Sequence, residues 1–116
     1  MSKLVLSLLS LDLDLTHAFY ERLGFCLSGG AAHSGWIELS RNAVVIQFYH
    51  DLPNGTHATP SMSGTIYVHV DEVDTLAAAL AESSVFEWGP ETMDYGMREF
   101  AVRDPNGYLL AFTAPA

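Results

Sequence analysis

The chain has 116 residues, of which 49% are hydrophobic, so it can build one compact domain or two small halves that share a core. Its 14 acidic and 5 basic residues give a formal net charge of -9, which disfavours nucleic acid and anionic membranes as partners. No apolar run approaches the ~18 residues that a membrane span requires. The acidity either attracts a cation to a site where carboxylates gather or serves only solubility.

The first half, about residues 1–50, predicts a strand, a helix and three further strands. The strand-like run LVLSLLSL comes first, and Asp12 and Asp14 follow it at the start of a helical pattern, where acidic residues suit both the N-cap and the helix dipole. Gly24 is placed to end that helix. Three strand-like runs then alternate with turns: GFCLSGG, SGWIELS and AVVIQFY.

The single cysteine, Cys26, follows the first helix. One cysteine cannot form a disulfide within the chain, so we expect a reducing, cytoplasmic compartment. Because Cys26 lies in the apolar stretch LGFCLS, the sequence predicts a small core residue rather than a nucleophile.

A linker of about residues 51–63, rich in Pro, Gly, Ser and Thr, separates the halves. The second half, about residues 64–116, begins with the strand GTIYVHVD and continues with Glu72 and Asp74 before the helical run TLAAALAESS. The strands VFEWG, MREFAVR and YLLAFT complete it. The turn at 104–107, sequence DPNG, is expected to be structural.

The two halves repeat one another. AVVIQF aligns with GYLLAF, so that Gln47 corresponds to Ala111, and the first strands align with Val5 on Thr65. Each half is therefore a β-α-β-β-β module too short to bury its own face, and we expect the modules to pair within the chain or across two chains. The predicted fold is α+β: a single domain, 1–116, in which the paired modules form a curved mixed sheet with a concave cleft and helices on the outer face.

Alternation along the strands assigns residues either to the helix side or to the cleft side. The side chains that we expect to contact a ligand are Trp36, Glu38, Gln47, Tyr49, Tyr67, His69 and Ala111 from this alternation, and Trp88 from the start of a loop beside the cleft. Simpler roles remain open for several of them. Trp36 suits packing in a dimer interface, Trp88 suits loop anchoring, Glu38 suits a solvated strand, and Arg98 suits pairing with a carboxylate.

The chain resembles the glyoxalase / bleomycin-resistance / dioxygenase superfamily, also called the vicinal oxygen chelate fold. The resemblance covers the whole chain and rests on FYERLGF at 19–25, VDEVDTL at 70–76, YGMREFAVRDPNGYLLAF at 95–112, and the paired modules. It implies a homodimer and a cleft mouth lined by the stretch 95–99, so that Tyr95, Met97 and Glu99 are further expected ligand contacts. In the enzymes of the superfamily it also implies a divalent metal held by His or Glu on the first and last strands of each module.

Carried over by the internal alignment, the four metal positions of the family are Val5, Gln47, Thr65 and Ala111. Val and Ala cannot coordinate, and Thr and Gln are weak neutral ligands, whereas a divalent ion needs at least three good donors. We therefore expect no metal and no other cofactor. Of the five histidines only His69 is expected to face the cleft, with Glu38 or Glu99 as partners.

A cleft without metal ligands resembles the bleomycin-resistance branch, whose members are small acidic homodimers that hold bulky cationic or aromatic antibiotics. Aromatic walls offer contact area and stack on planar groups or cations. The leading hypothesis is a metal-free binding protein that sequesters a small aromatic or cationic molecule. Two alternatives stay open: a divergent lyase or dioxygenase, with His69 and Glu38 or Glu99 as acid-base groups, and a dimeric regulatory module with a vestigial cleft.

Overall fold

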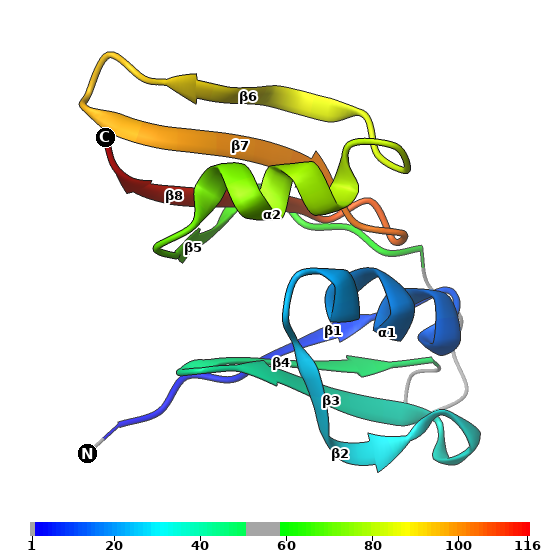
Figure 1. Ribbon diagram of the computed structural model, residues 1–116. Helices are drawn as coiled ribbons and strands as arrows, with labels where there is room; N and C mark the ends of the chain where they lie inside the picture. The colour runs from blue at the N-terminus through cyan, green and yellow to red at the C-terminus, as the bar shows by residue number, and fades with distance from the viewer. Residues whose placement is uncertain (1, 51–58) are drawn as a thin grey trace. The chain divides into compact units, whose positions relative to one another are not determined.

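The computed structural model describes residues 2–50 and 59–116, which form two compact units, Met1–Ser61 and Met62–Ala116 (Figure 1). The elements of the first unit are β1 (Leu6–Leu9), α1 (Leu13–Arg22), β2 (Cys26–Ala31), the short 3-10 helix η1 (Ala32–Ser34), β3 (Trp36–Arg41) and β4 (Val44–Tyr49). Those of the second are β5 (Ile66–His69), α2 (Val73–Leu80), β6 (Phe86–Thr92), β7 (Met97–Arg103) and β8 (Leu109–Pro115). Most of the predicted linker lies outside the described residues.

Each unit has its own four-stranded mixed sheet, in the order β1-β4-β3-β2 in the first and β5-β8-β7-β6 in the second. The first strand of each module runs parallel to the last, and the other pairings are antiparallel. The α+β fold and the module order are confirmed. The strands form two separate sheets instead of one hydrogen-bonded sheet, because the crossover helix returns the chain to pair the first strand of each module with its own last strand.

The first unit builds its core between α1 and one face of its sheet. Asp12 caps α1 by accepting a hydrogen bond at Oδ1 from the Leu15 amide, 3.0 Å away, and Gly24 follows the helix with φ +85°. The Tyr20 ring packs edge-on against Phe25 and lies 5.2 Å from that of Phe48, centroid to centroid. Sequence alternation thus assigned the helix side of this sheet correctly.

The prediction that Cys26 is a core residue is wrong, because its side chain is exposed. Phe25, immediately before it, is only 1% exposed and occupies the core position. Since consecutive side chains of a strand point to opposite faces, Cys26 points outward from the edge strand β2.

The second unit repeats this arrangement with α2 over its sheet (Figure 1). The rings of Phe100 and Phe112 stack at 5.2 Å in its core. Glu72 precedes α2 but, unlike Asp12, makes no side-chain cap hydrogen bond. Asp104 is buried, and its Oδ1 accepts hydrogen bonds from the amides of Asn106 and Tyr108, so the turn is structural as predicted.

The edge strand of each sheet, β2 or β6, contains a bulge beside a glycine. The pairing register shifts between Leu27 and Gly29 on β2, and again on either side of Trp88 on β6. Beside these shifts lie Gly30 with φ +68° and Gly89 with φ +71°. A Cβ atom on Gly30 would overlap the Trp36 carbonyl oxygen, and one on Gly89 would overlap that of Glu99. Only glycine fits at either position.

Neither α1 nor α2, the α-helices of the described ranges, is long and apolar enough to cross a membrane.

Candidate functional site

Strand register arranges the sheet residues opposite the helices in transverse rows. In the first unit, one row is Ser7, Gln47 and Glu38, and the next is Leu9, Tyr49 and Trp36. In the second unit, the corresponding rows are Tyr67, Ala111 and Ala101, followed by His69, Thr113 and Glu99. The polar row of one module therefore corresponds to an apolar or aromatic row of the other.

In the first unit, Glu38 lies at the centre of a network of side-chain hydrogen bonds. Glu38 accepts a hydrogen bond at Oε1 from Gln47 Nε2, 3.1 Å away, and another at Oε2 from Ser28 Oγ, 2.8 Å away. Ser28 Oγ also pairs with Ser40 Oγ. The hydrogen bonds from Gln47 and then Ser28 favour the carboxylate and lower the pKa of Glu38 below its usual range. Both carboxylate oxygens thus have protein donors.

In the second unit the side chain of Glu99 is buried on the face away from α2, only 1% exposed. Trp88 Nε1 donates to its Oε2 at 2.8 Å, and the Tyr95 hydroxyl donates to its Oε1 at 2.7 Å. The bond to Glu99, followed by partial burial and the nearby negative charge, raises the pKa of Tyr95. The phenol therefore remains a proton donor at neutral pH, and two uncharged donors hold the carboxylate in place.

A pocket of about 200 Å³ opens beside this carboxylate. Its lining residues are Tyr67, His69, Tyr95, Met97, Glu99 and Thr113. Thr113 is only 2% exposed, and its Oγ1 has no hydrogen-bond partner among the described residues. Leaving a buried hydroxyl unpaired costs about 1–3 kcal/mol. A pocket-lining residue with an unpaired buried hydroxyl is a candidate partner for a water or a bound molecule.

Five of the eleven predicted contact residues line this pocket: Tyr67, His69, Tyr95, Met97 and Glu99. Trp88 supports it by its bond to Glu99. Ala111 is fully buried between its neighbours Tyr67 and Ala101 and does not line the pocket.

The remaining candidates, Trp36, Glu38, Gln47 and Tyr49, lie together on β3 and β4 of the first unit. Sequence reasoning missed Thr113, although alternation on the last strand already placed it on the side away from the helix. A hydroxyl carries little signal on its own, and only its burial without a partner distinguishes it.

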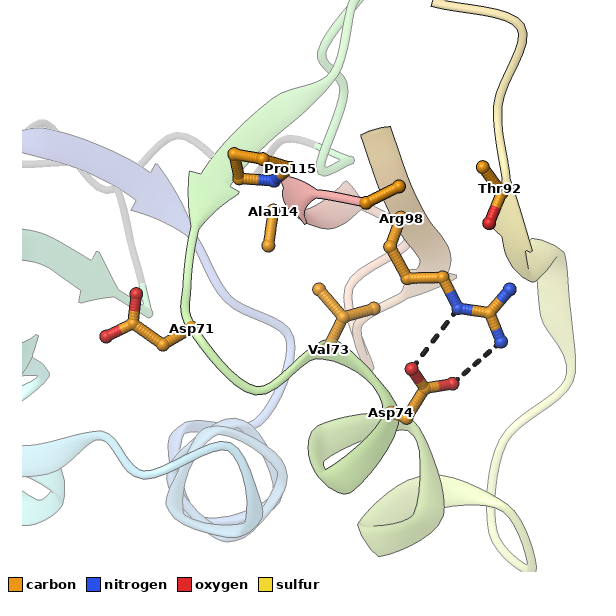
Figure 2. A pocket seen from close by; sticks show the side chains of 8 residues that line it. Asp71, Val73, Asp74, Thr92, Arg98, Ala114 and Pro115 are labelled. Carbon is orange, nitrogen blue, oxygen red and sulfur yellow. Dashed lines mark hydrogen bonds and ion pairs between the residues drawn. The ribbon is translucent and has the colours of Figure 1, made fainter. Parts of the chain in front are cut away.

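A second groove of about 310 Å³ lies elsewhere in the second unit (Figure 2). Figure 2 shows Arg98 turned toward Asp74, with two hydrogen bonds at 2.8 and 3.2 Å. This pairing lowers the pKa of Asp74, mainly through the hydrogen bonds from the guanidinium. Arg98 is thus paired with a carboxylate, the simpler role that the sequence left open, and its charge is offset within the protein.

The residues at the metal positions of the superfamily do not fit a metal. Val5 and Thr65 lie just before β1 and β5, and in register the neighbour of Gln47 is Ser7. Ala111 pairs with Tyr67. None of the four positions, Val5, Gln47, Thr65 and Ala111, carries an imidazole or a carboxylate. In residues 2–50 and 59–116, no three His, Cys, Asp or Glu side chains are grouped as a metal site would require.

Comparison with solved structures gives three informative matches. The bleomycin resistance determinant encoded on the transposon Tn5 is 25% identical, with a TM-score of 0.73 and coverage of 99% of this chain and 98% of that one. A bleomycin-binding protein complexed with bleomycin is 24% identical, with a TM-score of 0.69 and full coverage of both chains, 100% each. TnmS3, an antibiotic binding protein from Streptomyces sp. CB03234, is 22% identical, with a TM-score of 0.77 and coverage of 100% and 97%.

A search of curated proteins found no match. The family model described as the glyoxalase/bleomycin resistance protein/dioxygenase superfamily matches residues 6–112, nearly the whole chain. With the repeated β-α-β-β-β modules and the similarity to bleomycin-resistance structures, this match shows that the chain belongs to the glyoxalase/bleomycin resistance protein/dioxygenase superfamily.

Proposed function

We propose that the protein is a metal-free binding protein that sequesters a small aromatic or cationic molecule, such as an antibiotic, without transforming it. The observation that carries the proposal is the pocket of the second unit, where a buried carboxylate and an unpaired hydroxyl lie beside exposed aromatic rings. The similar bleomycin-binding and antibiotic-binding proteins support the same class of function.

The chemistry of the pocket suits a flat, electron-poor guest. Tyr67 and Tyr95 are 51% and 60% exposed, so their rings are available for stacking on a planar group or a cation. Glu99 supplies negative charge at the base, and the net charge of -9 raises the local concentration of cations.

The size of the pocket limits what it holds. A volume of about 200 Å³ accommodates a single ring with its substituents, so a larger antibiotic would extend beyond it.

We also propose a homodimer, in which a second chain contributes further contact area. Light scattering coupled to size-exclusion chromatography tests this part, and a mass of 12.7 kDa, that of one chain, would contradict it.

Thermal unfolding with a panel of cationic glycopeptides and planar aromatic cations tests the proposed function. Ligand at 100 times its Kd stabilises the folded state by about 2.7 kcal/mol, which raises the melting temperature by several degrees. Tryptophan fluorescence should change in the same samples, because Trp88 contacts the pocket carboxylate.

The matched control is Glu87→Gln, which removes an exposed carboxylate from β6 that pairs with Arg103 and not with the pocket. This variant should respond to ligands as the parent does. The absence of any thermal or fluorescence response across the panel would contradict the proposal. Ligand recovered by mass spectrometry should be unchanged, and a chemically altered product would instead support the enzyme hypothesis.

A further inference from the structure

We propose that Glu99 and Thr113 together recognise a planar group with two adjacent N–H donors, of the amidinium or guanidinium type. This inference rests on the proposed binding function and specifies what the pocket binds. The two residues face each other across β7 and β8, so their side chains lie next to one another on the same face of the sheet.

Glu99 is a buried charge with incomplete compensation. Its hydrogen-bond donors, Trp88 and Tyr95, are both neutral, and no Lys, Arg or His of the described residues forms an ion pair with it. A carboxylate has about four acceptor positions, and two of them are in use here. A buried carboxylate is costly unless it is paired, so a cationic donor is the complement that this group lacks.

Thr113 supplies the second, independent observation. The residue lines the pocket, and its buried hydroxyl has no partner among the described residues. Beside the carboxylate it can accept one hydrogen bond, so the two side chains offer two neighbouring acceptors. A fork of N–H groups on one planar cation satisfies both at once, as guanidinium groups do with carboxylates.

The rest of the pocket agrees with a planar cation attached to a ring. Tyr67 and Tyr95 present aromatic surface, and Met97 adds an adaptable apolar contact. About 200 Å³ corresponds to the liquid volume of roughly six or seven waters at ~30 Å³ each, the scale of a single substituted ring. An anionic group of the same shape is excluded, because it would meet Glu99 without a countercharge.

Three probes of the same shape but different charge separate the need for positive charge from the need for a planar ring. They are benzamidinium, benzamide and benzoate, which are cationic, neutral and anionic. The indole N–H signals of Trp88 and Trp36 in a nitrogen–proton NMR spectrum give the readout, since Trp88 donates to Glu99 and Trp36 belongs to the other unit. Benzamidinium should move the Trp88 signal and bind about tenfold or more tightly than benzamide. Benzoate should not bind.

Two variants test the two acceptors. Thr113→Val keeps the shape and removes the hydroxyl, so benzamidinium should bind about five- to tenfold more weakly. The same change should raise the melting temperature of the free protein, because it removes a buried unpaired group, and a purely structural threonine would not give this opposite pair of effects. Glu99→Gln should weaken benzamidinium at least tenfold, while Glu87→Gln should change nothing.

The outcomes keep this inference separate from the proposed function. Equal binding of benzamidinium and benzamide, or unchanged binding by Thr113→Val, would overturn the inference, even if the antibiotic panel still binds and the proposed function stands. A lack of binding by every probe and every panel compound would overturn both. If Glu99→Gln does not fold, Thr113→Val and the three probes still decide.

Discussion

The two modules use the same backbone frame but place their polar side chains in different rows. In the first module Gln47 and Glu38 pair across the strands, where the second module has Ala111 and Ala101. One row further on, the first module carries aromatic Tyr49 and Trp36, and the second carries the polar pair Thr113 and Glu99. The two modules thus share their strand arrangement, and their polar rows are offset by two residues.

The two polar rows also differ in how completely they are satisfied. In the first module, Glu38 has a protein donor on each oxygen and lies within reach of solvent. In the second, Glu99 is buried with two neutral donors, and Thr113 beside it lacks a partner. A closed network favours a structural role, whereas an incomplete buried one favours binding. The predictions that follow test this contrast, from the largest expected effect to the smallest.

The shared frame predicts that the two bulge glycines are equally indispensable. Gly30→Ala and Gly89→Ala should each lower the free energy of unfolding by about 3 kcal/mol or more, because a Cβ combines a left-handed φ with overlap against a carbonyl oxygen. Gly35→Ala is the control. Its φ is +88° but its Cβ would meet open space, so it should cost about 1 kcal/mol. Urea denaturation measures the free energy of unfolding of all three variants. A loss of only about 1 kcal/mol in Gly30→Ala or Gly89→Ala would show that the two bulges are not equivalent.

The contrast in burial predicts unequal effects of removing the two carboxylates. Glu99→Ala should destabilise the protein by about 2 kcal/mol, because it leaves the partly buried Trp88 N–H without its acceptor. Glu38→Ala should have a much smaller effect, since water can replace its partners. Equal unfolding midpoints for Glu99→Ala and Glu38→Ala would contradict the view that the Glu99 row is buried and the Glu38 row is solvated.

The Tyr95–Glu99 bond predicts a pH effect in the alkaline range. The pKa of Tyr95 is raised in the folded protein, so the folded state keeps its proton after unfolded chains lose theirs near pH 10. Stability from this bond is therefore fully present below about pH 10 and is lost as pH rises through the higher folded pKa. Ultraviolet titration should show a late-titrating tyrosine that is lost in Tyr95→Phe, and Glu99→Gln should return the pKa of Tyr95 toward the ordinary range.

The closed network of the first module predicts a smaller effect at acidic pH. The pKa of Glu38 is lowered, so its contribution to stability is present above the ordinary glutamate pKa of about 4.3 and is lost as pH falls through the lower folded pKa. Gln47→Leu removes the main cause and should move the pKa of Glu38 upward in a carbon NMR titration. Ser28→Ala should do the same to a lesser degree, and the reverse order would contradict the assignment.

Much of the fold follows from local chemistry in the sequence. Apolar alternation on the strands, the Asp12 cap, Gly24 and the 104–107 turn each correspond to a contact seen in the structure. Cys26 was misassigned because an apolar neighbourhood says nothing about which side of an edge strand a residue takes. The division of the strands into two sheets depends on which strands pair, and alternation alone does not contain that information.

The candidate site was predictable in outline. Aromatic and acidic residues on the cleft side identified Tyr67, Tyr95 and Glu99. Thr113 could not be selected, because its importance lies in a missing hydrogen bond, which only atomic positions reveal. The burial of Ala111 likewise depends on what its neighbours cover.

The glycine bulges have a consequence for how such a protein changes over time. Gly89 lies against backbone atoms only, among them the carbonyl oxygen of Glu99, whereas Gly30 lies against both the carbonyl oxygen and the indole ring of Trp36. The bulge on β6 therefore does not depend on which side chain stands at position 99, but the bulge on β2 is fitted to the tryptophan. Selection for a new ligand can exchange the glutamate without refitting its bulge, whereas a change at Trp36 also alters what β2 packs against.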